Sequence, residues 1–250
     1  MRVVWPDAAQ GGNVVNLWIQ GFGPMPGGGP MPNCCLCLDL RAERRTDIWN
    51  TPLLESENFL AIPSLGSLVP GWVLLLPKDH YLSMGALPSY LVGEMMEVKQ
   101  ELASRLSETF GDLCAFEHGA SRTKRNVGCG VDHAHLHVVP INFELRRAAQ
   151  RFLPSGQRWS SGNLDDCRKA YAEGRDYLYL EQPLGSGSIA VDDDFGSQVF
   201  RRAIANELGM SDEYNWREHP QFPNIVSTVR TLQYGHTAAL IGQPEVGSIP

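Results

Sequence analysis

Three histidines alternate with apolar residues in the stretch His133-Ala134-His135-Leu136-His137-Val138-Val139. Residues two apart in a β-strand point to the same face, so the pattern predicts a strand with three imidazoles on one side. Such a stripe is unfavourable to bury unless it meets water, a metal or an anion. The stretch therefore indicates metal binding or chemistry at a phosphoryl group. An exposed polar strand face is the alternative.

The segments around this strand predict an α+β domain. Apolar residues recur at helical spacing from Pro88 to about Phe110, and Gly111 is suited to end that helix. Further strands are predicted within 51–61, with a hairpin turn at Glu57-Asn58, and at 72–76 and 113–116. A hairpin, a long helix and then more strands favour an antiparallel sheet.

Composition excludes several classes of protein. The chain has 250 residues and a net charge of −7, which argues against a general coat for DNA or RNA. No apolar run approaches the ~18 residues of a membrane span. The first residues lack the apolar core of a signal peptide. We therefore expect a cytoplasmic protein without a membrane partner.

Two segments of different character flank the predicted domain at 33–150. Residues 1–32 are rich in Gly and Pro and are predicted to form a flexible arm. Residues 151–250 predict an α/β extension, with helices near 164–173, 195–208 and 224–232. Gly185-Ser186-Gly187 predicts a hairpin between two strands of this extension.

The histidine stretch resembles the signature of the histidine triad (HIT) superfamily of nucleotidyl hydrolases and transferases. Two other segments resemble the same family and stand in its order. Cys34-Cys35-Leu36-Cys37 is similar to the Cys-x-x-Cys of zinc-carrying members, and residues 69–80 look like the strand before the long helix. The resemblance covers about 33–145. It implies a HIT-like sheet, and a homodimer unless the extension covers the shared surface.

The resemblance also implies a mechanism. His135 would be the nucleophile that attacks an α-phosphorus, forming a nucleotidyl-imidazole that water or another acceptor resolves. His137 would contact the phosphoryl oxygens and share in proton handling. Backbone N–H groups of Gly128, Cys129 and Gly130 would bind the same oxygens. The implied activity is hydrolysis or transfer at a nucleoside 5′-monophosphoryl bond, in a phosphoric anhydride or a phosphoramidate.

A structural zinc ion is implied in the same way. Carried over from zinc-carrying members, its ligands are Cys34, Cys37, His80 and His133. Two cysteines and two histidines make a closed tetrahedral site. Cys35 could replace Cys34, and cysteines that are merely small buried apolar residues are the alternative.

The chain departs from the family pattern at three places. Trp72 stands where many members have a fourth histidine; an indole can donate but never ionise, and it could stack on a base. Ser64 falls near the usual ribose-binding carboxylate or amide. Cys129-Gly130 replaces a Gln-Ser pair. These departures leave open a second hypothesis, a catalytically weak nucleotide- or RNA-binding module.

A loop before the histidine stretch offers further candidates for nucleotide binding. Glu117 stands where family members often place a polar substrate-binding side chain. The cations that follow, Arg122, Lys124 and Arg125, could clamp phosphates, or could simply form a solvated loop.

The extension offers weaker candidates. Gln198 or Arg201 would reach the substrate if their predicted helix folds over the cleft. Trp216 and His219 are interpreted as packing and turn residues.

Overall fold

A computed structural model describes residues 31, 34–40, 47–128 and 130–234. The predicted arm, apart from Met31, lies outside these residues, as does Cys129. None of the described helices is both long and apolar enough to cross a lipid bilayer.

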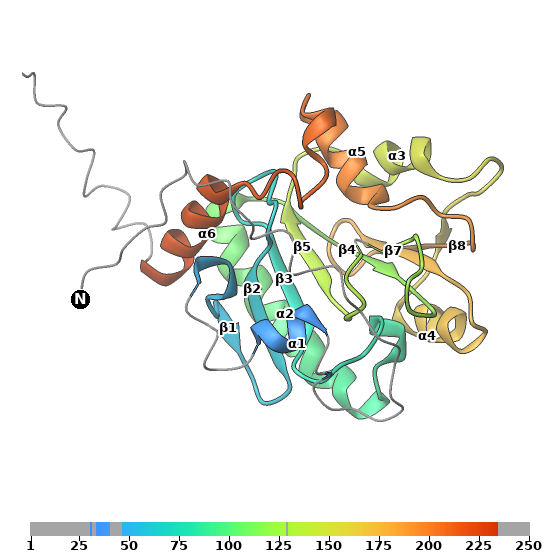
Figure 1. The fold of residues 1–250 in the computed structure, drawn as a ribbon, viewed down its shortest axis with the longest axis horizontal. Helices are drawn as coiled ribbons and strands as arrows, with labels where there is room; N and C mark the ends of the chain where they lie inside the picture. The colour runs from blue at the N-terminus through green and yellow to red at the C-terminus, as the bar shows by residue number, and fades with distance from the viewer. Residues whose placement is uncertain (1–30, 32–33, 41–46, 129, 235–250) are drawn as a thin grey trace, which may run out of the picture.

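A single antiparallel sheet organises the molecule (Figure 1), with the strand order β1-β2-β3-β5-β4-β7-β8-β6. Its strands are β1 Leu54–Glu55, β2 Phe59–Pro63, β3 Val73–Pro77, β4 Leu113–Gly119, β5 Leu136–Pro140, β6 Ser160–Ser161, β7 Tyr177–Glu181 and β8 Gly187–Val191. The α-helices are α1 Cys35–Asp39, α2 Ser89–Phe110, α3 Leu145–Ala149, α4 Leu164–Ala172, α5 Val199–Glu207 and α6 Phe222–Tyr234. Short 3-10 helices are η3 Ile48–Asn50, η4 Met84–Ala86, η5 Gln150–Phe152 and η6 Ser211–Glu213. The predicted α+β class is confirmed.

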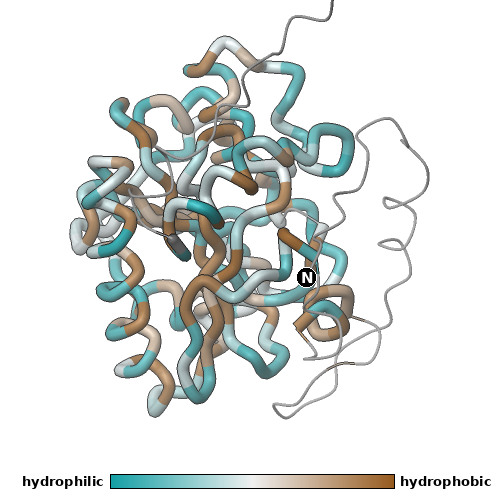
Figure 2. Tube along the Cα trace, turned by 90° about the vertical axis from the view of Figure 1, so that its left-hand side faces the viewer, coloured by the Kyte–Doolittle hydropathy of each residue, from teal (hydrophilic) through white to brown (hydrophobic). Residues whose placement is uncertain are grey.

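Helices cover both faces of the sheet. The long helix α2 buries the apolar positions that its sequence predicts, Leu91, Met95, Val98, Leu102 and Leu106, against alternate residues of β2, β3, β4 and β5. The opposite face is covered by α3 and α5 and, beside β2 and β3, by α1. Figure 2 shows apolar residues gathered along the central strands. The sheet is therefore the middle layer between two apolar cores.

The extension continues this sheet. Strand β7 pairs with β4, from Ala115 opposite Glu181 to Gly119 opposite Tyr177, and β8 pairs with β7 as the predicted hairpin. A buried ion pair joins the two parts a second time, because Lys99 of α2 contacts Glu181 of β7 at 2.7 Å. No break in the sheet accompanies the boundary expected at residue 150.

The histidine stretch differs from its prediction. Strand β5 begins only at Leu136, so His133 and His135 precede it and do not share one strand face with His137. The backbone N–H of Ala134 bonds to the carbonyl of Tyr81 instead of joining the ladder. Pairing of β5 with β3 begins at Leu136 opposite Leu75, and the chain before it turns His133 toward α1. An alternation with a period of two residues predicts an extended backbone, but it does not show at which residue strand pairing begins.

Candidate functional site

Four side chains from three distant segments converge beside α1. Cys34 and Cys37 lie at the start of α1, His80 follows β3, and His133 precedes β5. Their ligand atoms lie within 4.8 Å of one another, so the cluster could hold a metal ion. Cys35 is not part of the cluster.

Hydrogen bonds orient the histidines of this cluster. His133 donates from Nε2 to the carbonyl of Pro77 at 2.9 Å, which leaves Nδ1 to face the Sγ atoms of Cys34 at 3.6 Å and Cys37 at 3.4 Å. His80 places its Nδ1 3.5 Å from the Sγ of Cys37. A carbonyl behind a histidine is the usual support of a metal-binding imidazole.

His135 and His137 lie next to each other and carry their protons on different ring nitrogens. His135 Nδ1 lies 2.6 Å from the carbonyl oxygen of His133; a carbonyl only accepts, so Nδ1 carries the proton and Nε2 keeps a lone pair. Trp72 donates from Nε1 to His137 Nδ1 at 2.9 Å, so in neutral His137 the proton is on Nε2. One ring therefore presents a lone pair and its neighbour an N–H donor.

The surroundings of these rings keep them neutral. Burial lowers the pKa of His135, and burial together with the nearby imidazoles lowers the pKa of His137 well below its ordinary value. The guanidinium of Arg201 adds to both effects. A neutral imidazole is the nucleophilic form of histidine.

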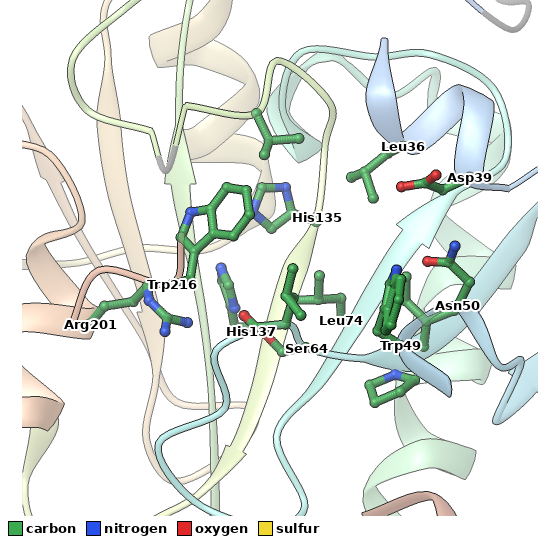
Figure 3. A pocket seen from close by; sticks show the side chains of 14 residues that line it. Leu36, Asp39, Trp49, Asn50, Ser64, Leu74, His135, His137, Arg201 and Trp216 are labelled. Atoms are coloured by element: carbon green, nitrogen blue, oxygen red, sulfur yellow. The ribbon is translucent and has the colours of Figure 1, made fainter. Parts of the chain in front are cut away.

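Both imidazoles line one pocket (Figure 3). Opposite them, Trp49 and Asn50 of η3 and the apolar side chains of Leu36, Ile62 and Leu74 form another part of the lining. Arg201 and Trp216 of the extension flank the histidines, and the guanidinium points toward His137. The remaining lining residues are Asp39, Pro63, Ser64, Leu65 and Val131.

Some of the predicted nucleotide-binding residues line the pocket and others do not. Ser64 lines the pocket. Trp72 is fully buried, with its ring edge-on to Phe116 and His137, so the expectation that it stacks on a base has to be corrected. It orients His137 instead.

Glu117 does not line the pocket. Its carboxylate accepts from Tyr177 Oη and from the backbone N–H of Met84, both at 2.6 Å. Burial raises the pKa of this carboxyl to about 7. Because side chains alternate along β4, Glu117 lies on the α2 side of the sheet with Ala115. Glu117 therefore does not contact a ligand in this pocket.

The predicted cationic loop also lies away from the pocket lining. Arg125 pairs with Asp176 at 2.6 Å, the backbone N–H of Lys124 bonds to Asp132, and Arg122 contacts the carbonyl of Gly174. These partners stabilise the loop outside the pocket lining, and phosphate binding by its cations stays a prediction.

The predicted glycine loop makes its described contacts through carbonyl groups. The Gly128 carbonyl accepts from Ser197 Oγ at 3.0 Å, and the Gly130 carbonyl accepts from Arg217 at 3.2 Å. Neither glycine is among the residues that line the pocket, and Cys129 lies outside the described part of the chain. The loop thus meets the extension.

Trp216 and His118, which lie near the two imidazoles, are among the residues of this region that sequence reasoning missed. Trp216, interpreted as a packing residue, lines the pocket. His118 is a fourth buried histidine; its ring centroid lies 6.1 Å from that of His137, and its Nε2 accepts from the Phe200 N–H at 3.2 Å. Burial lowers the pKa of His118 to about 3. The alternation of β4 could have predicted the place of His118, because it puts His118 on the same face of the strand as Phe116.

Comparison with known proteins finds a family match that covers part of this site. Residues 45–144 match the family model described as "HIT domain". The chain is 27% identical over 209 residues to zinc finger CCCH domain-containing protein 59 of Oryza sativa subsp. japonica. That match covers 71% of this chain and 32% of the rice protein, so the chain spans about a third of that relative's length.

Solved structures of HIT proteins are similar to parts of the chain. A HIT family protein from Bacillus anthracis is 22% identical, with 45% of this chain and 76% of that chain covered and a TM-score of 0.37. A Zn-bound histidine triad family protein from Mycobacterium smegmatis is 25% identical, with 58% and 96% covered and a TM-score of 0.35.

Proposed function

We propose that this protein is a nucleotidyl hydrolase or transferase with His135 as its nucleophile, a proposal supported by the match of residues 45–144 to the HIT domain model. Its substrate carries a nucleoside 5′-monophosphoryl group on a phosphate or amine leaving group. The observation that carries the proposal is the opposed protonation of the two pocket imidazoles, a lone pair on His135 Nε2 and a proton on His137 Nε2. A nucleophile and a phosphoryl-oxygen donor are what the first step requires.

In that step, the Nε2 lone pair of His135 forms a bond to the α-phosphorus. The bond from phosphorus to the leaving group breaks, and the leaving atom takes its electron pair; a phosphate leaves as its anion, and an amine takes up a proton from solvent as it leaves. The Nδ1 proton stays on the ring, and the His133 carbonyl stabilises the resulting charged imidazole. His137 donates its Nε2 proton as a hydrogen bond to a phosphoryl oxygen and keeps that proton, because Trp72 occupies its other nitrogen.

In the second step, water or another acceptor attacks the same phosphorus. The nitrogen–phosphorus bond breaks and its electron pair returns to His135 Nε2. The acceptor's proton passes to solvent, and the products are a nucleoside monophosphate, or its ester or amide, and the free leaving group. The apolar lining at Leu36, Ile62 and Leu74 suits the flat face of a base.

The metal of the neighbouring cluster is proposed to be zinc. Bonds of ~2.3 Å to sulfur and ~2.0 Å to nitrogen around a tetrahedral centre put sulfur and nitrogen roughly 3.5 Å apart. The three sulfur–nitrogen distances here are 3.4, 3.5 and 3.6 Å. A closed Cys₂His₂ site stabilises structure and supplies no open position for catalysis, so zinc would fix His133, whose carbonyl orients His135.

The test is a search for the covalent intermediate. The protein is incubated with dinucleoside polyphosphates and nucleoside phosphoramidates labelled at the α-phosphate, and quenched in alkali because phosphorylated imidazole is acid-labile. We expect a labelled protein in the wild type and in His219→Ala, a matched histidine variant outside the pocket lining. His135→Ala should carry no label.

A different result would favour the alternative function. Nucleotide binding without label or product, across adenine, guanine, cytosine and uracil substrates, would refute the enzyme and support a binding module. Label that persists in His135→Ala would refute His135 as the nucleophile.

A further inference from the structure

Arg201 brings a charged group from the extension to the pocket. The residue lies on α5 and is only 1% exposed, yet it lines the pocket beside both imidazoles. Figure 3 shows its guanidinium directed toward His137 and next to Trp216. The family match ends at residue 144, so this group comes from outside the matched domain.

Three contacts fix the guanidinium. Its Nε donates to the Tyr214 carbonyl at 2.9 Å, and its Nη2 donates to the Gly66 carbonyl. Its Cζ lies 4.8 Å from the centre of the Trp72 ring, a cation–π distance. The group is therefore held in place before any ligand arrives, which lowers the cost of binding.

Gly66 makes this arrangement possible. The residue adopts a φ of +74°, and a Cβ at this position would lie 2.7 Å from the Nη2 of Arg201 and 2.5 Å from the Cβ of Trp216. Only glycine allows the extension to approach so closely. The loop after β2 and the extension are thus fitted to each other at the pocket wall.

The charge of the pocket wall identifies the ligand chemistry. Among the described residues that line the pocket, Arg201 is the only arginine or lysine and Asp39 is the only carboxylate. Figure 3 shows the guanidinium beside His137, and Asp39 on the opposite side of the pocket. A guanidinium presents planar donors that match the oxygens of a phosphate group. Lysines and arginines of the loop at 122–125 do not line the pocket.

We infer that Arg201 is the phosphate-binding cation of this pocket, contributed by the C-terminal extension to the 5′-phosphoryl group of a nucleotide. The inference rests on the proposed function and names the group that recognises its substrate's charge. Because Arg201 lies beside His135 and His137, it contacts the phosphoryl group that His135 attacks. The extension is then part of the substrate site.

The test measures the preference for a phosphate without requiring turnover. Calorimetry compares each of the four nucleoside 5′-monophosphates with its nucleoside, in the wild type and in Arg201→Gln and Arg201→Met. Charged hydrogen bonds of this kind change affinity about ten- to a hundredfold. We expect both variants to lose about that much affinity for the monophosphate and to keep their nucleoside affinity within about twofold.

Two further variants sharpen the result. Arg202→Gln changes the neighbouring arginine on the same helix, which stacks on Phe152 and Tyr214 outside the pocket lining, and it should bind as the wild type does. Arg201→Lys keeps the charge and should restore part of the phosphate preference. Gln and Met differ in packing against Trp72, and thermal unfolding of each identifies which variants fold.

The possible results distinguish a failure of the proposed function from a failure of the Arg201 assignment. A wild-type protein that binds none of the eight compounds refutes the proposed function. A phosphate preference that survives in a folded Arg201→Gln or Arg201→Met protein, or that Arg202→Gln reduces equally, overturns the Arg201 assignment alone. Equal wild-type affinity for nucleosides and monophosphates overturns it as well.

Discussion

Replacement of Lys99 by methionine tests whether the extension and the domain that matches the HIT family model fold as one unit. The Nζ of Lys99 lies 2.7 and 2.8 Å from the two carboxylate oxygens of Glu181, and both side chains are 7% exposed. Glu181 also accepts from Tyr179 Oη at 3.0 Å and from the Gly185 N–H at 2.8 Å. Methionine fills much of the space but leaves a buried carboxylate without its cation.

The expected cost follows from that lost cation. Removing one partner of a buried ion pair costs about 3–5 kcal/mol, a large share of the ~5–15 kcal/mol by which a protein is stable. The double variant Lys99→Met with Glu181→Gln removes the isolated charge, and should recover most of the loss. Arg105→Met breaks an exposed pair with Glu101 and should cost less than ~1 kcal/mol.

Urea unfolding at neutral pH, followed by tryptophan fluorescence and by circular dichroism, measures these differences. We expect Lys99→Met to unfold at lower urea with both probes still coincident. A loss below about 1 kcal/mol, or a double variant no more stable than Lys99→Met, would refute the coupling of α2 to β7 by this pair.

Three other results are expected. Trp72→Phe removes the donor to His137 Nδ1, so it should cost ~1–3 kcal/mol in urea unfolding and lower turnover at least about tenfold, as loss of a positioned donor does; unchanged turnover would contradict the orienting role. Burial raises the pKa of Glu117 to about 7 from 4.5, so the folded state retains a proton that the unfolded chain loses, and the free energy of unfolding should fall by about 3 kcal/mol as pH rises from ~4.5 to ~7. Glu117→Gln should abolish that part of the pH dependence, and parallel curves for the two proteins would refute it. Elemental analysis should find one zinc per wild-type chain and loss of zinc with a lower melting temperature in Cys37→Ser; a wild type without bound metal would defeat the assignment.

A local pattern was sufficient for the long helix α2. The 3.6-residue period of α2 requires only its own sequence, and all five predicted positions are buried. The resemblance of the Cys and His segments predicted the four residues that converge beside α1. Zinc itself and the roles of His135 and His137 stay predictions.

Long-range partners account for what the sequence did not predict. Arg125 belongs to a cationic run, but Asp176, which pairs with it, comes 51 residues later and no local pattern identifies it. Trp216 reaches the pocket because Gly66 admits it, a contact between segments far apart in sequence. The three histidines were expected on one strand because alternation does not reveal where the pairing of β5 with β3 begins.

The pairing of β4 with β7 has a consequence for solubility. In a chain ended near residue 150, the seven buried residues of β4 would form an open sheet edge, with backbone groups free to bind another molecule's strand. In the full chain, β7 covers that edge, and the sheet ends instead at the two exposed residues of β6. A short exposed strand is a poor template for association. We therefore expect the C-terminal strands to prevent association through the β4 edge, a role independent of any ligand.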